Sequence, residues 1–288
     1  MNFEQQDLMG KVCLVTGATA GIGQATAMLL AKRGATVIGI GRNRTKNEYS
    51  TQRIKEETAN PAVEYLLADL SSQKEIRALA QQFHEKYDRL DVLVNNAGAT
   101  FGKRLESVDG IEMTFALNHL GYFLLTNLLR ETLEANRPSR VINVSSSLHK
   151  LGKIDFDNIP LEKGYARSKA YQRSKLANIG FTYEMARRLC SCDVTVNAMN
   201  PGLVNTNVGQ VAGGVAAKMK GLVDKIAGLT PEEGAQTIIY LATSPDVVGV
   251  TGRYFVKEKS IPSSKVTYDL DFCRRLWDVS EELISRAH

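Results

Sequence analysis

The sequence predicts an α/β fold, a doubly wound parallel sheet of seven strands with helices on both faces, in one domain spanning residues 1–288. Three observations predict it. Short β-branched runs alternate with longer stretches in which apolar residues recur every three or four positions. A glycine-rich turn joins the first run to the first longer stretch. The composition, 43% hydrophobic and 23% charged, is that of a globular protein with a sizeable core.

Seven short apolar runs are the expected strands: residues 11–16, 36–40, 63–68, 90–94, 140–144, 193–199 and 252–256. Seven longer stretches are the expected helices: residues 21–33, 47–58, 72–87, 110–126, 171–190, 231–242 and 270–285. Gly34 ends the first helix as a C-cap residue. Thr230 and Glu233 have the spacing of a capping box at the start of the helix at 231. Strict alternation of strands and helices is typical of a parallel sheet.

Charge and cysteine usage exclude several classes of protein. The net charge of +5 is mild and the basic residues are interspersed with acidic ones, so we expect no nucleic-acid partner. The four cysteines and four histidines have no metal-ligand or C-x-x-C spacing, which indicates free thiols and no metal site. The N-terminus lacks signal-peptide character and no apolar window reaches membrane-spanning length. We therefore expect a cytoplasmic protein without a membrane span.

The turn after the first strand is a candidate phosphate-binding loop. Its glycines let a backbone approach a pyrophosphate, and the following helix offers free N–H groups and the positive end of its dipole. Its candidate cofactor-binding residues are Gly17, Thr19, Gly21, Ile22 and Gly23. The spacing is G-x-x-x-G-x-G, and the alternative is a glycine-rich turn that binds nothing.

Arg42 follows the second strand, where dinucleotide folds often have an acidic residue for the adenosine ribose. No acidic residue occurs before Glu48, and a guanidinium suits a 2′-phosphate. The sequence therefore favours NADP(H) over NAD(H). The alternative is a solvated loop arginine.

Further candidates follow the third and fourth strands. Asp69, next to Leu70, is expected either to accept a hydrogen bond from adenine or to cap the next helix with Ser71. The fourth strand ends in small and amide residues that suit a backbone passing close to a ligand. The candidates there are Asn95, Ala97 and Gly98.

The motif Tyr-x-x-x-Lys occurs twice, as Tyr165/Lys169 and Tyr171/Lys175. On a helix, residues four apart share a face, and a nearby ammonium lowers the pKa of a phenol, which makes an acid/base group. The bland alternative is a surface pair. The downstream copy is favoured because an apolar stripe through Ile179 follows it.

Taken together, these motifs resemble the short-chain dehydrogenase/reductase family and its Rossmann-type fold. The matching stretches run almost from end to end: Thr16 to Gly23, Asn95 to Gly98, Asn118, Ser146, Tyr171/Lys175 and Pro201-Gly202. Residues 118–126, 171–178 and 275–280 are similar to the retinol dehydrogenase and protochlorophyllide reductase-like branch. Two positions depart from the pattern. The branch usually has histidine where Asn200 stands, and Ala20 replaces the basic residue that some NADP enzymes have before Gly21.

The resemblance implies a role for each matching residue. Tyr171 would be the general acid/base, Lys175 would lower its pKa and hold the nicotinamide ribose, Ser146 would bind the reacting oxygen, and Asn118 would hold a water. The cofactor would also contact four residues after the sixth strand: Pro201, Gly202, Val204 and Thr206. Because side chains alternate along a strand, Ser145 is expected to point away from the face that Ser146 uses.

The resemblance also implies a substrate lid at residues 207–228, for which the alternative is a surface helix packed on the core, and a homodimer or homotetramer. The leading hypothesis is an NADP(H)-dependent oxidoreductase acting on an apolar carbonyl or alcohol. The alternatives are a reductase of carbon–carbon double bonds and a non-enzymatic regulator that binds the cofactor.

Overall fold

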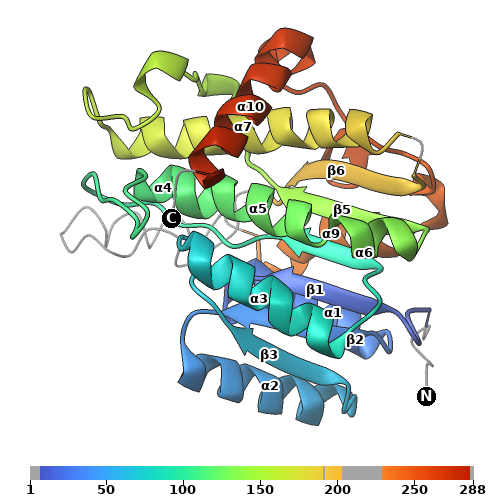
Figure 1. Cartoon of the computed structure of the whole chain (residues 1–288). Helices are drawn as coiled ribbons and strands as arrows, with labels where there is room; N and C mark the ends of the chain where they lie inside the picture. Colours follow the sequence, from blue (N-terminus) through green and yellow to red (C-terminus); the bar gives the residue numbers. More distant parts are fainter. Residues whose placement is uncertain (1–6, 191, 203–228, 286–288) are drawn as a thin grey trace.

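The computed structural model describes residues 7–190, 192–202 and 229–285, and its strands form one sheet (Figure 1). The strand order is β3-β2-β1-β4-β5-β6-β7-β8. The first seven strands are all parallel, as predicted, and their bounds are close to the expected ones. They are β1 (Val12–Thr16), β2 (Thr36–Gly41), β3 (Val63–Leu67), β4 (Val92–Asn95), β5 (Ser139–Val144), β6 (Val194–Asn200) and β7 (Tyr254–Val256).

The eighth strand is an addition that the sequence did not predict. Strand β8 (Lys259–Ser260) has two residues and pairs antiparallel with β7. The turn between them places Lys257 and Glu258 at φ of 48° and 64°. Two positive φ values are typical of the hairpin turns that glycine and asparagine usually mark. Because neither residue type is present here, the turn carried no signal in the sequence.

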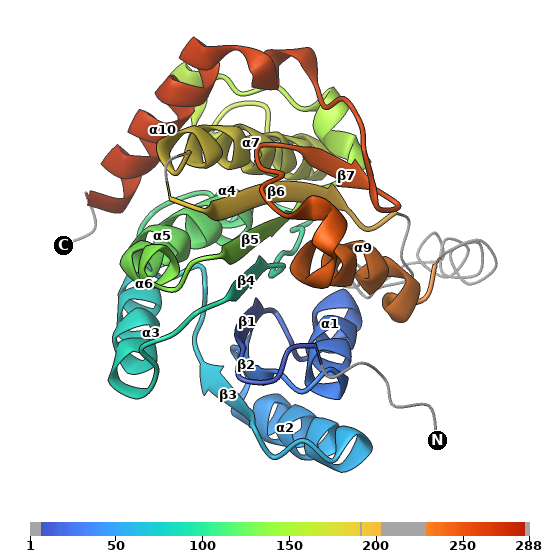
Figure 2. The same ribbon diagram turned by 90° about the vertical axis from the view of Figure 1, so that its right-hand side faces the viewer.

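Helices cover both faces of the sheet, as Figure 2 shows. One face carries α1 (Gly21–Lys32), α2 (Arg44–Thr58) and α9 (Pro231–Thr243). The other carries α3 (Gln73–Lys86), α5 (Gly121–Leu128), α6 (Arg130–Ala135) and α7 (Arg167–Arg188). A large cluster of buried apolar side chains fills each of the two layers. This is the doubly wound arrangement that the alternation of strands and helices predicts.

The single helix expected at 110–126 is in fact three segments. Glu112 caps the first turn, because its carboxylate accepts the N–H groups of Thr114 and Phe115, so α4 (Met113–Phe115) begins only there. A π-helical segment, η1 (Ala116–Leu120), separates α4 from α5. In it the N–H of Gly121 reaches back five residues to the carbonyl of Ala116. Apolar periodicity alone does not reveal such a widened turn.

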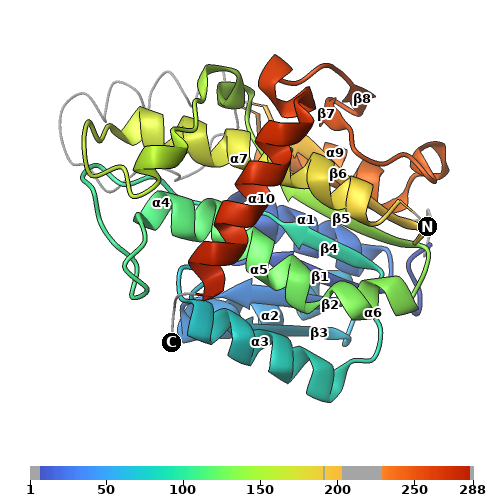
Figure 3. The same ribbon diagram turned by 45° about the horizontal axis from the view of Figure 1, so that its top comes forward.

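The C-terminal helix α10 (Leu270–Ser285) has the predicted bounds and crosses over α7 (Figure 3). Trp277 packs against Phe123 and Phe181, with ring centroids 4.8 and 6.0 Å away. The guanidinium of Arg188 stacks on the same indole at 4.0 Å. The helix therefore completes the core on this face of the sheet.

The strand order reverses between β1 and β4, which lie side by side although two strands separate them in sequence. In open parallel sheets, ligands bind beyond the carboxyl ends of the strands at such a reversal. Most of the candidate site residues lie at this edge.

Candidate active site

The glycine turn after β1 is too tightly packed for side chains. Gly17 has a φ of +65°, and a Cβ atom there would lie 2.8 Å from the Cα of Ala97. A Cβ on Gly23 would overlap the carbonyl oxygen of Gly17. Gly21 has a φ of +54°. The turn therefore requires glycine for backbone conformation at some positions and for close approach at others.

Two polar residues to which the sequence analysis assigns no role hold this turn against β4. The hydroxyl of Thr16 accepts the N–H groups of Asn96 and Ala97 at 2.8 and 3.0 Å. The amide of Asn96 donates to the carbonyl of Thr16 at 2.8 Å. A threonine directly before the glycine turn and an amide at the end of β4 were the available signals, but only the fold brings them together.

The start of α1 is left open for an anion. Its N-cap residue is Ala20, which has no side chain to bind the free N–H groups of the first turn. Thr19 and Ile22 flank this position and are partly exposed. A phosphate group at this helix N-terminus would satisfy these donors.

The adenosine end of the expected cofactor site lies at the tips of β2 and β3. Arg42 is exposed directly after β2. The Asn47 amide donates to the carbonyls of Gly41 and Leu66, both at 3.1 Å, and so joins the two strand ends. Tyr65 donates to the carbonyl of Ala18 inside the glycine turn at 2.9 Å. Asn47 and Tyr65 are further supports that sequence reasoning missed.

Asp69 organises the turn after β3, next to the buried Leu70. One oxygen of its carboxylate accepts both the N–H and the hydroxyl of Ser71, at 2.9 and 2.7 Å. The N-cap of α3, however, is Ser72, which binds the N–H of Glu75. The alternative that Asp69 caps the helix together with Ser71 is therefore wrong, because Ser72 is the N-cap residue.

The side chain of Asn95 is buried in the interior. Its side-chain amide donates to Thr126 and to Asn143, both at 2.9 Å, and Asn143 in turn donates to Thr182. This buried chain ties β4 and β5 to α5 and α7. Any contact of Asn95 with a cofactor would have to use its main chain.

The catalytic candidates Tyr171 and Lys175 lie one turn apart on α7. The Lys175 ammonium is buried and donates to the carbonyl of Val144, at the end of β5, at 2.9 Å. It lies 5.7 Å from the centre of the Tyr171 ring. Ser146 follows β5 by two residues, and its hydroxyl lies close enough to the Tyr171 phenol to lower the pKa of that phenol. The fold thus brings these three residues together.

Burial controls the ionisation of this pair. It raises the pKa of the Tyr171 phenol, and the neighbouring Ser146 hydroxyl offsets part of this rise. It lowers the pKa of Lys175 to about 7. The expected lowering of the Tyr171 pKa by Lys175 is therefore not found, because burial of the phenol has the largest effect on its pKa.

Asn118 lies in the π-helical segment and is fully buried. Its side chain accepts the N–H of Ala99 at 2.9 Å and donates to the carbonyl of Ala99 at 3.0 Å and to Ser174 at 3.1 Å. It thus joins the chain beyond β4 to α7, one residue before Lys175. Single π turns often mark functional sites, because they re-aim side chains.

The two neighbouring serines use opposite sides of the chain. Ser145 is buried, and its hydroxyl donates to the carbonyl of Lys175 at 2.8 Å. Ser146 is the serine that meets Tyr171. This arrangement agrees with the alternation expected along β5.

The upstream copy of the motif occupies a different place. Tyr165 precedes α7, and its hydroxyl donates to the carbonyl of Phe101 at 2.8 Å. Lys169 is exposed and reaches the carbonyl of Gly164 at 3.5 Å. This copy therefore fastens a loop and does not face Ser146.

The main chain after β6 turns at Gly202, whose φ is +86°, and Asn200 accepts the N–H of Gly202 at 3.2 Å. This turn carries the candidate Pro201 at the same edge of the sheet. Val204, Thr206 and the expected lid at 207–228 lie outside the described residues.

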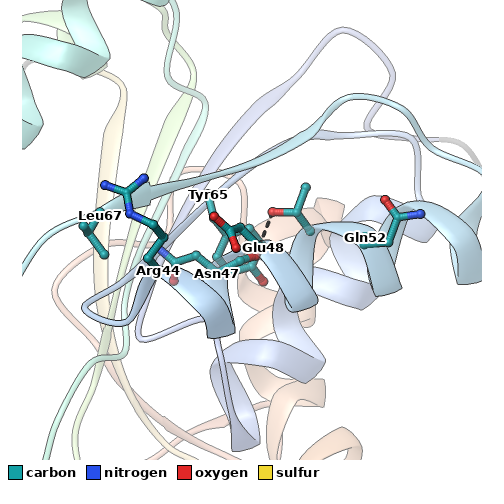
Figure 4. A pocket seen from close by; sticks show the side chains of 7 residues that line it. Arg44, Asn47, Glu48, Gln52, Tyr65 and Leu67 are labelled. Carbon is teal, nitrogen blue, oxygen red and sulfur yellow. Dashed lines mark hydrogen bonds between the residues drawn. The ribbon is translucent and has the colours of Figure 1, made fainter.

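A pocket of about 290 Å³ lies between α2 and β3 (Figure 4). Its lining residues are Arg44, Asn47, Glu48, Thr51, Gln52, Tyr65 and Leu67. None of them is a catalytic candidate, and the pocket is separate from the group formed by Ser146, Tyr171 and Lys175.

The described residues contain neither a membrane-spanning helix nor a cluster of metal ligands. None of the described helices combines the length and apolar character that crossing a bilayer requires. Across the same part of the chain, no three His, Cys, Asp or Glu side chains gather as a metal site would need.

Comparison with known proteins shows what the chain is similar to. The sequence model of the short chain dehydrogenase family matches residues 11–213. Retinol dehydrogenase 14 of Mus musculus is 44% identical over 96% of this chain and 86% of its own length. Polyprenol dehydrogenase of Homo sapiens is 41% identical over 95% of this chain and 84% of its own length. Among solved structures, the Pseudomonas aeruginosa RhlG/NADP active-site complex superposes with a TM-score of 0.71, at 29% identity over 88% of this chain and 97% of that one.

Proposed function

The chain belongs to the short chain dehydrogenase family and is an oxidoreductase of alcohol or carbonyl groups; from that premise we propose that it uses NADP(H) and acts on an apolar carbonyl or alcohol. The observation that carries the proposal is the meeting of Ser146, Tyr171 and Lys175 at the carboxyl end of β5. The names of the relatives, retinol and polyprenol dehydrogenases, support an apolar substrate. The NADP complex of the structural neighbour supports the choice of cofactor.

The residues of the glycine turn fit a dinucleotide. Gly17 and Gly23 let the turn pack closely against the protein's own backbone, the uncapped start of α1 suits a diphosphate, and the exposed Arg42 suits a 2′-phosphate. Bound NADPH would supply the hydride. The other proposed contacts are Thr19, Gly21, Ile22, Asp69, Leu70, Asn95, Ala97, Gly98, Pro201, Gly202, Val204 and Thr206.

In the direction of reduction, the Tyr171 phenol gives its proton to the carbonyl oxygen. The Ser146 hydroxyl hydrogen-bonds the same oxygen and holds it beside the phenol. Lys175 would hold the cofactor ribose, and its ammonium, 5.7 Å from the centre of the Tyr171 ring, would stabilise the phenolate that remains. Asn118 keeps the loop after β4 joined to α7.

The test is consumption of NADPH, followed by its absorbance, with all-trans-retinal, a polyprenal and an apolar enone. We expect the aldehydes to be reduced to alcohols, identified by chromatography. A saturated aldehyde or ketone as the product would instead support the reductase of carbon–carbon double bonds. Tight NADPH binding without turnover of any compound would support the regulator.

A further inference from the structure

His149 is a buried histidine with an unusual set of partners. It lies three residues after Ser146, in the 3₁₀ turn η2 (Ser147–Leu151), and is fully buried. Its ring packs edge-on against Tyr254 of β7, with centroids 4.8 Å apart. A buried imidazole must find a partner for each nitrogen, since an unsatisfied buried polar group costs about 1–3 kcal/mol.

Both ring nitrogens have such a partner, and the partners fix the tautomer. Nδ1 lies 2.6 Å from the carbonyl oxygen of Ser146, which can only accept. The main-chain N–H of Ser264 donates to Nε2 at 3.1 Å. The ring is therefore neutral, with its proton on Nδ1. Burial also lowers the pKa of His149, which agrees with the neutral form.

The turn around Ser146 is held on its other side by α7. The Ser145 hydroxyl donates to the carbonyl of Lys175. Gly152, at the end of the turn, packs so closely on α7 that a Cβ there would lie 2.6 Å from the carbonyl oxygen of Gln172. The side chain of Ser146 itself accepts only a long bond of 3.3 Å from the N–H of Leu148. The main chain, and not the side chain, therefore fixes where the Ser146 hydroxyl lies.

We propose that His149 is a positioning residue, which locks the main chain of Ser146 in front of Tyr171 by bridging the Ser146 carbonyl to the Ser264 amide. The inference rests on the proposed function in one respect, that the Ser146 hydroxyl binds the reacting oxygen. It adds the segment 261–268, more than 100 residues further along the chain, to the catalytic geometry. Thr267 braces this segment, because its N–H and hydroxyl both donate to the carbonyl of Ser264.

Three variants separate the two halves of the bridge. His149→Phe keeps an aromatic ring against Tyr254 and removes both nitrogens. His149→Asn keeps a donor near the position of Nδ1 and loses the reach to Ser264. Ser264→Pro removes the distant N–H without touching the ring, and the φ of −62° at Ser264 already suits proline.

The matched control is Ser263→Ala. It loosens the same segment, because the Ser263 hydroxyl hydrogen-bonds Tyr183 and Thr267, but it leaves the partners of His149 in place.

With NADPH and all-trans-retinal as the probe, we expect kcat to fall about 10- to 100-fold in His149→Phe, the scale of a small misplacement of a catalytic group. The kcat of Ser264→Pro should also fall, and the kcat of His149→Asn should lie between those of His149→Phe and the wild type. The KM and Kd for NADPH should stay within about twofold, since the glycine turn is not involved. Wild-type kcat in His149→Phe, or an equal loss in Ser263→Ala, would overturn the inference.

A second measurement does not depend on turnover. Proton–nitrogen correlation spectra of the histidine side chains, assigned with His149→Asn, should show a proton on Nδ1 of His149 and a lone pair on Nε2. The Ser264→Pro spectrum should shift the Nε2 signal alone. A proton on Nε2 in the wild type would refute the bridge even if retinal is not a substrate, whereas the predicted spectrum with an inactive wild type would count against the proposed function only.

Discussion

At the scale of single residues, folding changes the pKa of Lys175, and this change makes the stability of the protein depend on pH. Its pKa falls from an ordinary value of 10.5 to about 7, because the ammonium is buried. Below pH 7 the lysine is charged in both the folded and unfolded states, and folding bears the full cost of burying that charge. Between pH 7 and about 10.5 only the unfolded state holds the proton, so the stability of the folded state rises with pH.

Replacing Lys175 by methionine should therefore stabilise the cofactor-free protein while abolishing turnover. We expect the free energy of unfolding to rise by about 1–3 kcal/mol at pH 6.5, less than the full desolvation cost because the bond to Val144 is also lost. The gain should shrink towards pH 9.5, where the wild-type lysine is neutral when folded. Urea unfolding at the two pH values measures this difference, and a gain independent of pH would contradict the account.

Arg42 is the residue on which the preference for NADP(H) depends. Arg42→Ala should weaken NADPH binding by about 1.5–3 kcal/mol, the scale of a hydrogen bond to a charged group, and leave NADH binding nearly unchanged. Arg44→Ala, two residues further on at the start of α2, is the matched control. Titrations that show equal losses for the two cofactors would make Arg42 a structural residue.

At the scale of elements, α7 is anchored by a buried ion pair two residues beyond Tyr171. The Arg173 guanidinium lies 3.2 Å from the Glu112 carboxylate, and their side chains are 3% and 0% exposed. Arg173 also donates to the carbonyl of Ile159 at 2.7 Å and lies 5.0 Å from the centre of the Phe115 ring. One side chain thus joins α7 to α4 and to the loop before α7.

Arg173→Met should cost about 2–4 kcal/mol of unfolding free energy, because it leaves the Glu112 carboxylate buried without its counter-charge. We expect a loss of about 2 kcal/mol, because the N–H groups of Thr114 and Phe115 still bind that carboxylate. Adding Glu112→Gln should recover part of the loss.

The exposed pair Arg53–Glu57 provides the control, and Arg53→Ala should cost less than about 1 kcal/mol. Urea unfolding of the wild type, Arg173→Met, Glu112→Gln and the double variant measures the coupling between the two side chains. If the double variant is as unstable as the sum of its single variants predicts, the pair is not coupled.

The elements also show where sequence patterns succeed. The periodicity of α10 gave its start at Leu270, and the described part of the helix runs to Ser285 as expected. Helix α7 begins at Arg167, four residues before the expected start, since the polar first turn has no apolar stripe to mark it. The π-helical segment around Asn118 leaves apolar spacing almost unchanged, so the sequence predicted one unbroken helix.

At the scale of the whole molecule, the parallel sheet with helices on both faces follows from the alternation of strands and helices, whereas the order of the strands comes from the structure. Sequence motifs identified the candidate site residues that lie close together in the chain, as in the glycine turn and in Tyr171/Lys175. Residues that act through distant partners were missed. Thr16 with Asn96, and His149 with Ser264, lie 80 and 115 residues apart, and only folding creates these contacts.

The central claim is that Tyr171 is the acid/base group of an oxidoreductase, and the paired variants Tyr171→Phe and Tyr165→Phe test it most directly. Both remove one phenolic hydroxyl from a Tyr-x-x-x-Lys motif, but only Tyr171 meets Ser146, while Tyr165 binds the carbonyl of Phe101. Single-turnover consumption of bound NADPH by an apolar aldehyde should slow about 10²- to 10⁴-fold in Tyr171→Phe, with NADPH affinity unchanged. In Tyr165→Phe it should stay within a few-fold of the wild type. A Tyr171→Phe protein that keeps the wild-type rate, or the reverse order of the two variants, would contradict the account.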